Sequence, residues 1–431
     1  MAIQESAQKV VPVVEIAKNE LPLPAGPTGP EKPKVRTPDP ETTKHQSNSI
    51  LDTQQYTGVV TEAFSSGDRG VAHALVQIIG TQWQTYTDGN GIFAFENISV
   101  EGSLPVLVTK PGYMSRRIEL SQVVSTQVEL INENTAALSA KASDTELKYG
   151  SGFFFGQLSN TVKTADVQAM RVEVSGPQAV EVLYLDEKGL PNRSLTMTSS
   201  RGQFMILNMV MGTYLVTIVD AFGNERSPHI VHVSEGEGVV RRLSVGEARW
   251  VTGSVHNGTG GQPIDNAQIQ ILGSSKVTYT DAHGRFTLGP IYVDCSSLNY
   301  LQVEKNGFYR NRLDYKCSEQ NGADLYVFPK SHIDGLAMES GVSLNATKGL
   351  VIGHVSFTKS VKMQLWGPEE INPSAINSNN RGKDFYLDRD GTLNPARNRT
   401  SQNGTFLIVD SPEGFSYIQA FSKDNKTLSS W

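Results

Sequence analysis

Two cysteines are the side chains with the clearest chemical potential in this sequence. Cys295 and Cys317 are its only thiols, and between them lies Asn306-Gly307, a dipeptide that favours a tight β-hairpin turn. Strands paired about that turn place the cysteines one residue from direct opposition, so a small bulge would bring them within disulfide reach. A disulfide indicates an oxidising compartment outside the cytoplasm. Two buried free thiols are the alternative.

The segment DRDGTLN at 388–394 is the best candidate for a metal site. Asp388, Asp390 and Asn394 offer the oxygen ligands that calcium prefers. However, Gly391 is misplaced for an EF-hand loop, and no glutamate follows at the spacing that such a loop needs. We interpret the segment as a solvated turn, with calcium as the alternative, and expect no other cofactor.

No pattern of a catalytic centre occurs elsewhere. His229 and His232 lie three apart in HIVHV, a predicted strand, so they face opposite sides and do not form a metal pair. We interpret both as surface histidines. The sequence also lacks the zinc-protease, phosphate-loop, nucleophile-elbow and redox dithiol motifs. We therefore predict that this chain is not an enzyme.

These residues belong to a chain that contains a long internal repeat. TYTDGNGIFAF at 85–95 recurs as TYTDAHGRFTL at 278–288, and GFFFGQL at 152–158 corresponds to GLVIGHV at 349–355. Such self-similarity indicates repeated structural units, here a duplicated pair that we denote A–B–A′–B′. All four units share a Gly-x-Phe turn, with the glycine at Gly91, Gly202, Gly284 and Gly404.

Short apolar strands between turn signals are typical of β-sandwiches. The fold class that we predict is all-β, a tandem array of four Ig- or transthyretin-like sandwiches after a disordered, Pro-rich tether. The predicted boundaries are 1–54 for the tether, 55–140 for A, 141–247 for B, 248–330 for A′ and 331–431 for B′.

Units A and A′ resemble carboxypeptidase regulatory-like domains, a branch of the transthyretin-like sandwiches. The resemblance covers 55–135 and 248–330 and rests on T-x-T-D-x-x-G-x-F and on V-x-K-x-G-[YF] followed by a paired arginine, Arg117 in A and Arg312 in A′. It implies the sandwich fold and a place among appendages and repeats of bacterial envelope proteins. It implies no activity, since nothing supplies the zinc ligands of a carboxypeptidase. Asp88 and Asp281 are expected to hold their turns through backbone hydrogen bonds.

Net charge and the distribution of apolar residues argue against nucleic-acid binding and against a membrane span. A formal charge of −6 without a basic cluster argues against nucleic acid. The longest apolar stretch, Phe204–Val219, is interrupted by Asn208 and Gly212 and is predicted to form two strands, not a membrane span. Because a Pro-rich tether usually separates an anchored end from folded domains, we expect that an export signal or anchor has been removed from this chain.

Differences between the duplicates suggest contact sites. B carries Met209, Val210 and Met211 at a predicted loop tip where B′ is polar. An apolar tip favours packing against a neighbouring unit or an external partner. Trp366 precedes a longer loop in B′ and is expected to pack at the sandwich edge, or to stack on a sugar.

The first hypothesis is therefore a non-catalytic, extracytoplasmic structural or adhesive protein of a bacterial envelope. The sandwiches would form a rod whose loops contact a protein partner or another copy. The alternatives are a polysaccharide-binding array, which would need exposed aromatic platforms, and an accessory region of an enzyme whose catalytic part lies outside this chain.

Overall fold

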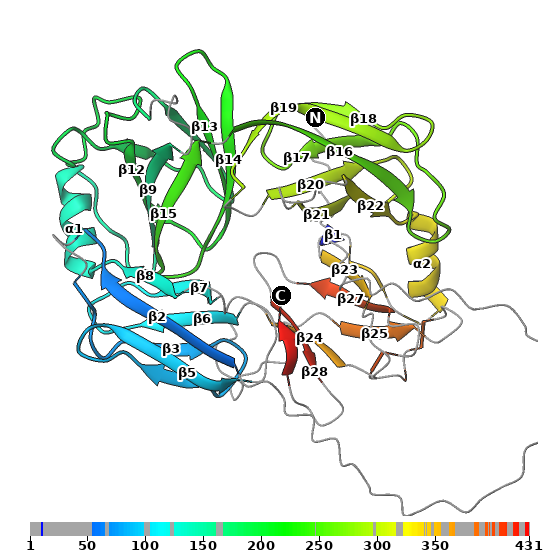
Figure 1. The fold of residues 1–431 in the computed structure, drawn as a ribbon, viewed down its shortest axis with the longest axis horizontal. Coiled ribbons are helices and arrows are strands. Elements are labelled where there is room, and N and C mark those ends of the chain that lie inside the picture. Colours follow the sequence, from blue (N-terminus) through cyan, green and yellow to red (C-terminus); the bar gives the residue numbers. More distant parts are fainter. Residues whose placement is uncertain are drawn as a thin grey trace, which may run out of the picture.

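The structure is a computed structural model. It describes residues 10–11, 54–64, 69–98, 104–120, 125–160, 167–245, 247–295, 299–315, 322–339, 341, 343–345, 349–354, 362–366, 383–387, 393–394, 396, 399–400, 405–411, 417–421 and 427–430. The predicted all-β class is confirmed, because the strands in this part of the chain form eight sheets that pair into four sandwiches (Figure 1).

Sandwich A consists of a three-stranded sheet, β5-β2-β8, and a four-stranded sheet, β4-β3-β6-β7. Its strands are β2 (Gln54–Glu62), β3 (Leu75–Ile78), β4 (Gln84–Tyr86), β5 (Ile92–Ile98), β6 (Leu104–Thr109), β7 (Arg116–Leu120) and β8 (Thr126–Leu130). A′ repeats this topology as β19-β16-β22 and β18-β17-β20-β21. Its strands are β16 (Glu247–Asn257), β17 (Gln268–Ile271), β18 (Val277–Tyr279), β19 (Arg285–Val293), β20 (Asn299–Glu304), β21 (Asn311–Tyr315) and β22 (Ala323–Val327).

Sandwich B consists of the sheets β10-β13-β14 and β11-β12-β9-β15. Its strands are β9 (Gly152–Asn160), β10 (Arg171–Ser175), β11 (Val182–Tyr184), β12 (Gln203–Met209), β13 (Gly212–Val219), β14 (Glu225–Val233) and β15 (Gly238–Val245). B′ consists of β24-β28-β29 and β1-β23-β27-β25-β26. Its strands are β1 (Val10–Val11), β23 (Gly349–His354), β24 (Lys362–Trp366), β25 (Lys383–Leu387), β26 (Leu393–Asn394), β27 (Thr405–Ser411), β28 (Tyr417–Phe421) and β29 (Thr427–Ser430). β1 lies within the predicted tether.

The Gly-x-Phe turn has the same role in all four sandwiches. The phenylalanines Phe93, Phe204, Phe286 and Phe406 are each buried. Each ring packs on a glycine of the first strand of its sandwich, where a Cβ would lie 2.2 to 2.7 Å from ring carbons: Gly58, Gly156, Gly253 and Gly353. Only glycine permits this close approach.

The turn itself forms as predicted. Asp88 Oδ1 accepts hydrogen bonds from the backbone amides of Asn90 and Ile92, at 2.9 and 2.8 Å. In A′, Asp281 Oδ1 accepts from the amides of His283 and Arg285, at 2.8 and 2.9 Å. The structural role of both aspartates is confirmed.

The predicted hairpin at Asn306-Gly307 is wider than expected. β20 and β21 pair with Val303 opposite Asn311, so the connection includes residues 304 to 310 and centres on Gly307. Asn306 and Gly307 do form the centre of a tight turn, because the amide of Phe308 donates to the carbonyl of Lys305 at 3.1 Å. Phe308 then forms a bridge to Pro329, so the two strands pair only beyond the turn.

One described helix joins A to B, and another joins A′ to B′. α1 (Glu133–Ala142) follows β8, and α2 (Lys330–Glu339) follows β22. Asn132 caps α1 by accepting a hydrogen bond from the amide of Asn134. Each helix buries a short apolar stripe against the sandwich that follows it. Neither described helix is long and apolar enough to span a membrane.

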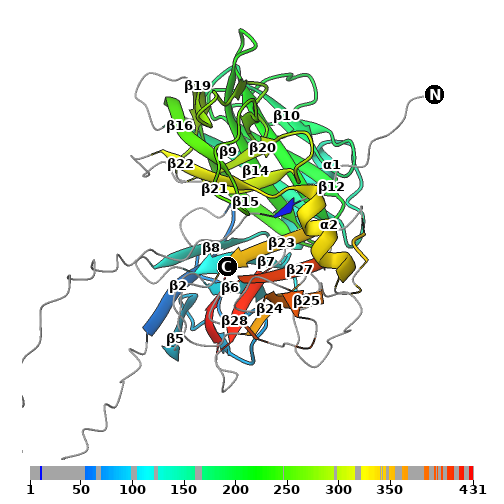
Figure 2. The same cartoon turned by 90° about the vertical axis from the view of Figure 1, so that its right-hand side faces the viewer.

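The four sandwiches lie around a ring (Figure 1). A and B occupy one side, A′ and B′ the other, and the last sandwich lies beside the first. In the perpendicular view, B and A′ lie together above A and B′ (Figure 2). β8 of A contacts β15, and β14 of B contacts β19 and β20. The predicted rod is therefore wrong: each unit contacts the next through its side, and the chain curves back.

Candidate functional site

Several of the residues predicted to do chemistry lie outside the described part of the chain. These are Cys317, Asp388 and Asp390, while Trp366 and Asn394 are described only in their backbones. The calcium site and the role of Trp366 therefore stay predictions. Within the described residues, no group of three His, Cys, Asp or Glu side chains could hold a metal ion.

Cys295 lies two residues after the end of β19 and is disulfide-bonded. Its predicted partner lies outside the described residues, so the pairing with Cys317 stays a prediction.

Met209 does not lie at the loop tip where it was predicted. Its side chain is completely buried in the core of B. β12 alternates regularly up to Leu207, but a bulge lies between Ile206 and Met209, and Asn208 in it has a φ of 56°. The extra residue reverses the alternation and turns Met209 inward. The prediction that Met209 belongs to a partner-binding site is therefore wrong, and the bulge explains why.

Val210 and Met211 do form an exposed hairpin tip. Their side chains are 44% and 43% exposed, between β12 and β13. The tip is held from below, because the buried Tyr214 donates its hydroxyl to the carbonyl of Val210 at 3.0 Å. Two apolar side chains are thus presented to solvent on a fixed backbone.

Asn208 fixes this tip to the segment that follows α1. Its Oδ1 accepts from the amide of Lys148 at 2.8 Å and from the hydroxyl of Ser151 at 3.1 Å. Its Nδ2 donates to the carbonyl of Glu146 at 2.9 Å. Sequence reasoning missed this anchor, although asparagine is among the residues that tolerate a left-handed backbone.

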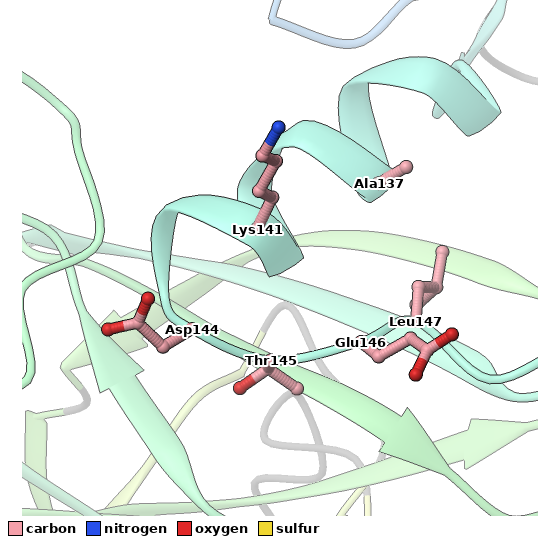
Figure 3. A pocket seen from close by; sticks show the side chains of 6 residues that line it. All are labelled: Ala137, Lys141, Asp144, Thr145, Glu146 and Leu147. Atoms are coloured by element: carbon pink, nitrogen blue, oxygen red, sulfur yellow. The ribbon is translucent and has the colours of Figure 1, made fainter.

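A shallow depression of about 490 Å³ adjoins the same segment (Figure 3). Ala137 and Lys141 line it from α1, and Asp144, Thr145, Glu146 and Leu147 from the chain that follows. Tyr149, next along this chain, is fully exposed. We call Val210, Met211, Tyr149 and residues 144–147 the hairpin-tip surface. Its mixture of apolar and charged groups suits contact with another macromolecule.

His229 is not the surface residue that was predicted. It is completely buried where β14 of B packs on A′. Its Nδ1 lies 3.9 Å from Oδ2 of Asp294, and among the described residues no hydrogen bond of good geometry reaches either ring nitrogen. Burial lowers the pKa of His229 to about 4, although the nearby Asp294 carboxylate acts in the opposite direction. His229 is therefore neutral at pH 7.

Glu237 joins A to B through buried charges. Its Oε1 pairs with Arg116 of A at 3.2 Å, with side-chain exposures of 3% and 12%. The same oxygen accepts from the amide of Arg117, and Oε2 accepts from the amide of Ser234, both at 2.9 Å. Burial lowers the pKa of the neighbouring Arg241 guanidinium, which donates to the carbonyl of Ile230. This network is structural, because it is closed off from solvent.

Comparison with known proteins finds distantly similar solved structures but no family. No family model and no curated protein matches the chain. Among solved structures, the Bacillus anthracis TIE protein is 15% identical with a TM-score of 0.15, and the alignment covers 64% of this chain and 50% of that one. A streptococcal ancillary pilin is 11% identical, with a TM-score of 0.21 and coverages of 64% and 99%.

A third structure, the major pilin BcpA of Bacillus cereus, is 10% identical with a TM-score of 0.15 and coverages of 64% and 99%. The chain thus matches only about half the length of the TIE protein, but nearly all of the two pilins. At these TM-scores the likeness carries no argument about function.

Proposed function

We propose that this chain is a non-catalytic structural or adhesive protein of an extracytoplasmic surface, which contacts a protein partner through the hairpin-tip surface. The observation that carries the proposal is the exposure of Val210 and Met211 on a backbone fixed by Tyr214 and Asn208. Apolar side chains held in place at a rim of polar residues are typical of contact sites.

Rigid sandwiches suit display and contact. A, B and A′ each have their own apolar core, so the position of a loop on them is fixed by the sheets beneath it. The disulfide at Cys295 accords with an oxidising compartment. A bacterial envelope is the setting that the carboxypeptidase regulatory-like resemblance implies.

The test is capture from a cross-linked envelope extract of the source organism, with the full chain as bait. Val210→Ser and Met211→Ser together should abolish recovery of one defined protein. Phe222→Ser is the matched control, because Phe222 is 89% exposed at the hairpin between β13 and β14, at the other end of β13. Equal recovery with all variants would contradict the proposal.

Polysaccharide binding is the second candidate. Tyr86 in A and Tyr279 in A′ are exposed at equivalent positions of the repeat, at 60% and 54%, and exposed rings can stack on sugars. Recovery of polysaccharide without a stoichiometric protein, lost on Tyr86→Ser and Tyr279→Ser, would favour this candidate over the first.

A further inference from the structure

In A, B and A′, the first strand pairs antiparallel with one strand and parallel with another of the same sandwich. In A, β2 pairs antiparallel with β5, the strand after the Gly-x-Phe turn, and parallel with β8, the last strand. In B, β9 pairs in the same way with β12 and β15. In A′, β16 pairs with β19 and β22. In all three, the parallel neighbour belongs to the same sandwich.

B′ follows this rule on one side only. Its first strand, β23, pairs antiparallel with β27, the strand after the Gly-x-Phe turn. On the other side, its parallel neighbour is β1, which comes from the far N-terminal end of the chain. β1 is the edge strand of this sheet.

The register shows that β1 occupies the place of β15. In B, Gly238 and Val239 lie opposite Phe153 and Phe154. Phe153 and Phe154 correspond to Leu350 and Val351 in the repeat GFFFG and GLVIG. Val10 and Val11 lie opposite those two residues, also in parallel.

The opposite side of β23 supports the same alignment. β9 and β12 carry a bulge after which Gly152 pairs with Met209. β23 and β27 carry a bulge at the same place, where Gly349 pairs with Ser411. The register of β23 therefore matches that of β9 on both sides, and the assignment of β1 to the position of β15 does not depend on one pairing alone.

We propose that the N-terminal segment around Val10-Val11 is a donor strand, which binds the open edge of β23 in the same chain and takes the position that β15 has in B. An exposed strand edge has unpaired amides and carbonyls, so an added strand gains main-chain hydrogen bonds there. The segment would thereby link the two ends of the ring.

The donor strand is supplied by the same chain. Residues 12–53 connect β1 to β2, and about 40 residues can reach up to ~130 Å when extended. B′ lies beside A, where this connection ends (Figures 1 and 2). Pro12 follows β1 at once, which suits an edge strand, where a missing amide is tolerated.

The first test is hydrogen exchange of the full chain, followed by mass spectrometry. With Val10→Pro and Val11→Pro together, the peptide that covers Gly349–His354 should exchange faster, because proline prevents the ladder. Val35→Pro, a matched change elsewhere in the N-terminal segment, should leave that peptide unchanged. Equal exchange in the double proline variant and the unaltered chain would overturn the proposal.

The second test identifies the source of the strand by disulfide trapping. Val11→Cys with Val351→Cys places thiols on paired residues, and a bond between them within one chain is the expected product. The control, Val11→Cys with Val251→Cys, uses the equivalent buried valine of A′ and should give no bond to residue 11. A 11–351 bond between two chains would show that the donor is a second copy, and absence of the bond would show that β23 is not paired; either overturns the proposal.

Discussion

The joint between A and B and the joint between A′ and B′ are two versions of one design, and they differ in their charges. In the first, α1 and the end of A pack on the outer face of the β9 sheet. In the second, α2 and the end of A′ pack on the outer face of the β23 sheet. Figure 1 shows the two helices on opposite sides of the ring.

The apolar part of the joint is repeated position by position. Met114, Ile131, Ala136, Phe153, Phe155, Met205 and Leu207 in the first joint correspond to Tyr309, Phe328, Ile333, Leu350, Ile352, Leu407 and Val409 in the second. Larger side chains from A′ and α2 meet smaller ones from B′. The larger side chains on one side of the joint thus compensate for the smaller ones on the other, and packed cores tolerate such exchanges when the total side-chain volume is kept.

The polar part is not repeated. Arg116, which pairs with Glu237, corresponds to Asn311, whose amide donates to the carbonyl of Tyr326 within A′. The apolar pattern therefore defines the joint, and the buried ion pair is an addition to the first copy. Four groups of substitutions test which contacts the two halves share and which belong to one half alone.

Glu237→Ala should give the largest effect. It leaves the guanidinium of Arg116 buried without its partner and frees two amides, which costs about 3–5 kcal/mol. Unfolding by denaturant should show the loss in the transition of the first pair. Glu173→Ala removes an exposed ion pair with Arg171 and should cost about 0–1 kcal/mol. Similar losses from both would contradict the role of Glu237.

His229 should make stability fall with acid at the interface of B with A′, outside both joints. Its pKa is 6.5 in the unfolded chain and about 4 when folded. The unfolded state therefore binds more protons between these values, so its contribution is full above pH 6.5 and is lost as pH falls towards 4. The loss is at most about 3 kcal/mol. Unfolding free energies measured from pH 7 to 4 should fall less steeply in His229→Gln; an unchanged slope would exclude His229 as the cause.

Gly156→Ala and Gly353→Ala should show that the two halves share their packing. In each, the new Cβ would lie 2.2 Å from a phenylalanine ring carbon, so each should cost about 1–3 kcal/mol by overpacking. Gly335→Ala in α2 meets nothing within 4 Å and should stabilise the helix by up to about 1 kcal/mol. Thermal melts of the three variants provide the measurement, and a cost in only one half would break the equivalence.

Asp88→Ala and Asp281→Ala should give the smallest effect, equal in A and A′. Each loses two hydrogen bonds at an exposed turn. The amides of Arg285 and His283 lower the pKa of Asp281, so its contribution should decrease only in acid. Melts at pH 7 should show smaller shifts than those of the glycine variants; a larger shift in one unit would indicate a further role there.

The sequence was sufficient for the features that repeat. The Gly-x-Phe turn and its flanking strands recur four times, so fold class and turn geometry could be predicted from residues such as Gly91 and Asp281 alone. α1 was missed because its Ala-rich face is only weakly apolar, although Asn132 gives a helix-capping signal.

Features that depend on contact between units could not be predicted from strand patterns. The burial of His229 requires A′ to cover β14, and the alternation of HIVHV is the same for a solvated strand. The burial of Met209 depends on a bulge at Asn208, which shifts the alternation by one residue. In both cases the residues of the strand alone do not show which elements will cover it or where its pairing is interrupted.

The four sandwiches close into a ring (Figure 1), and small-angle X-ray scattering of the full chain is the measurement that distinguishes a ring from a rod. We predict a compact pair-distance distribution with one main peak, in agreement with the arrangement in Figures 1 and 2. A distribution with the long, descending profile of a rod would contradict the ring.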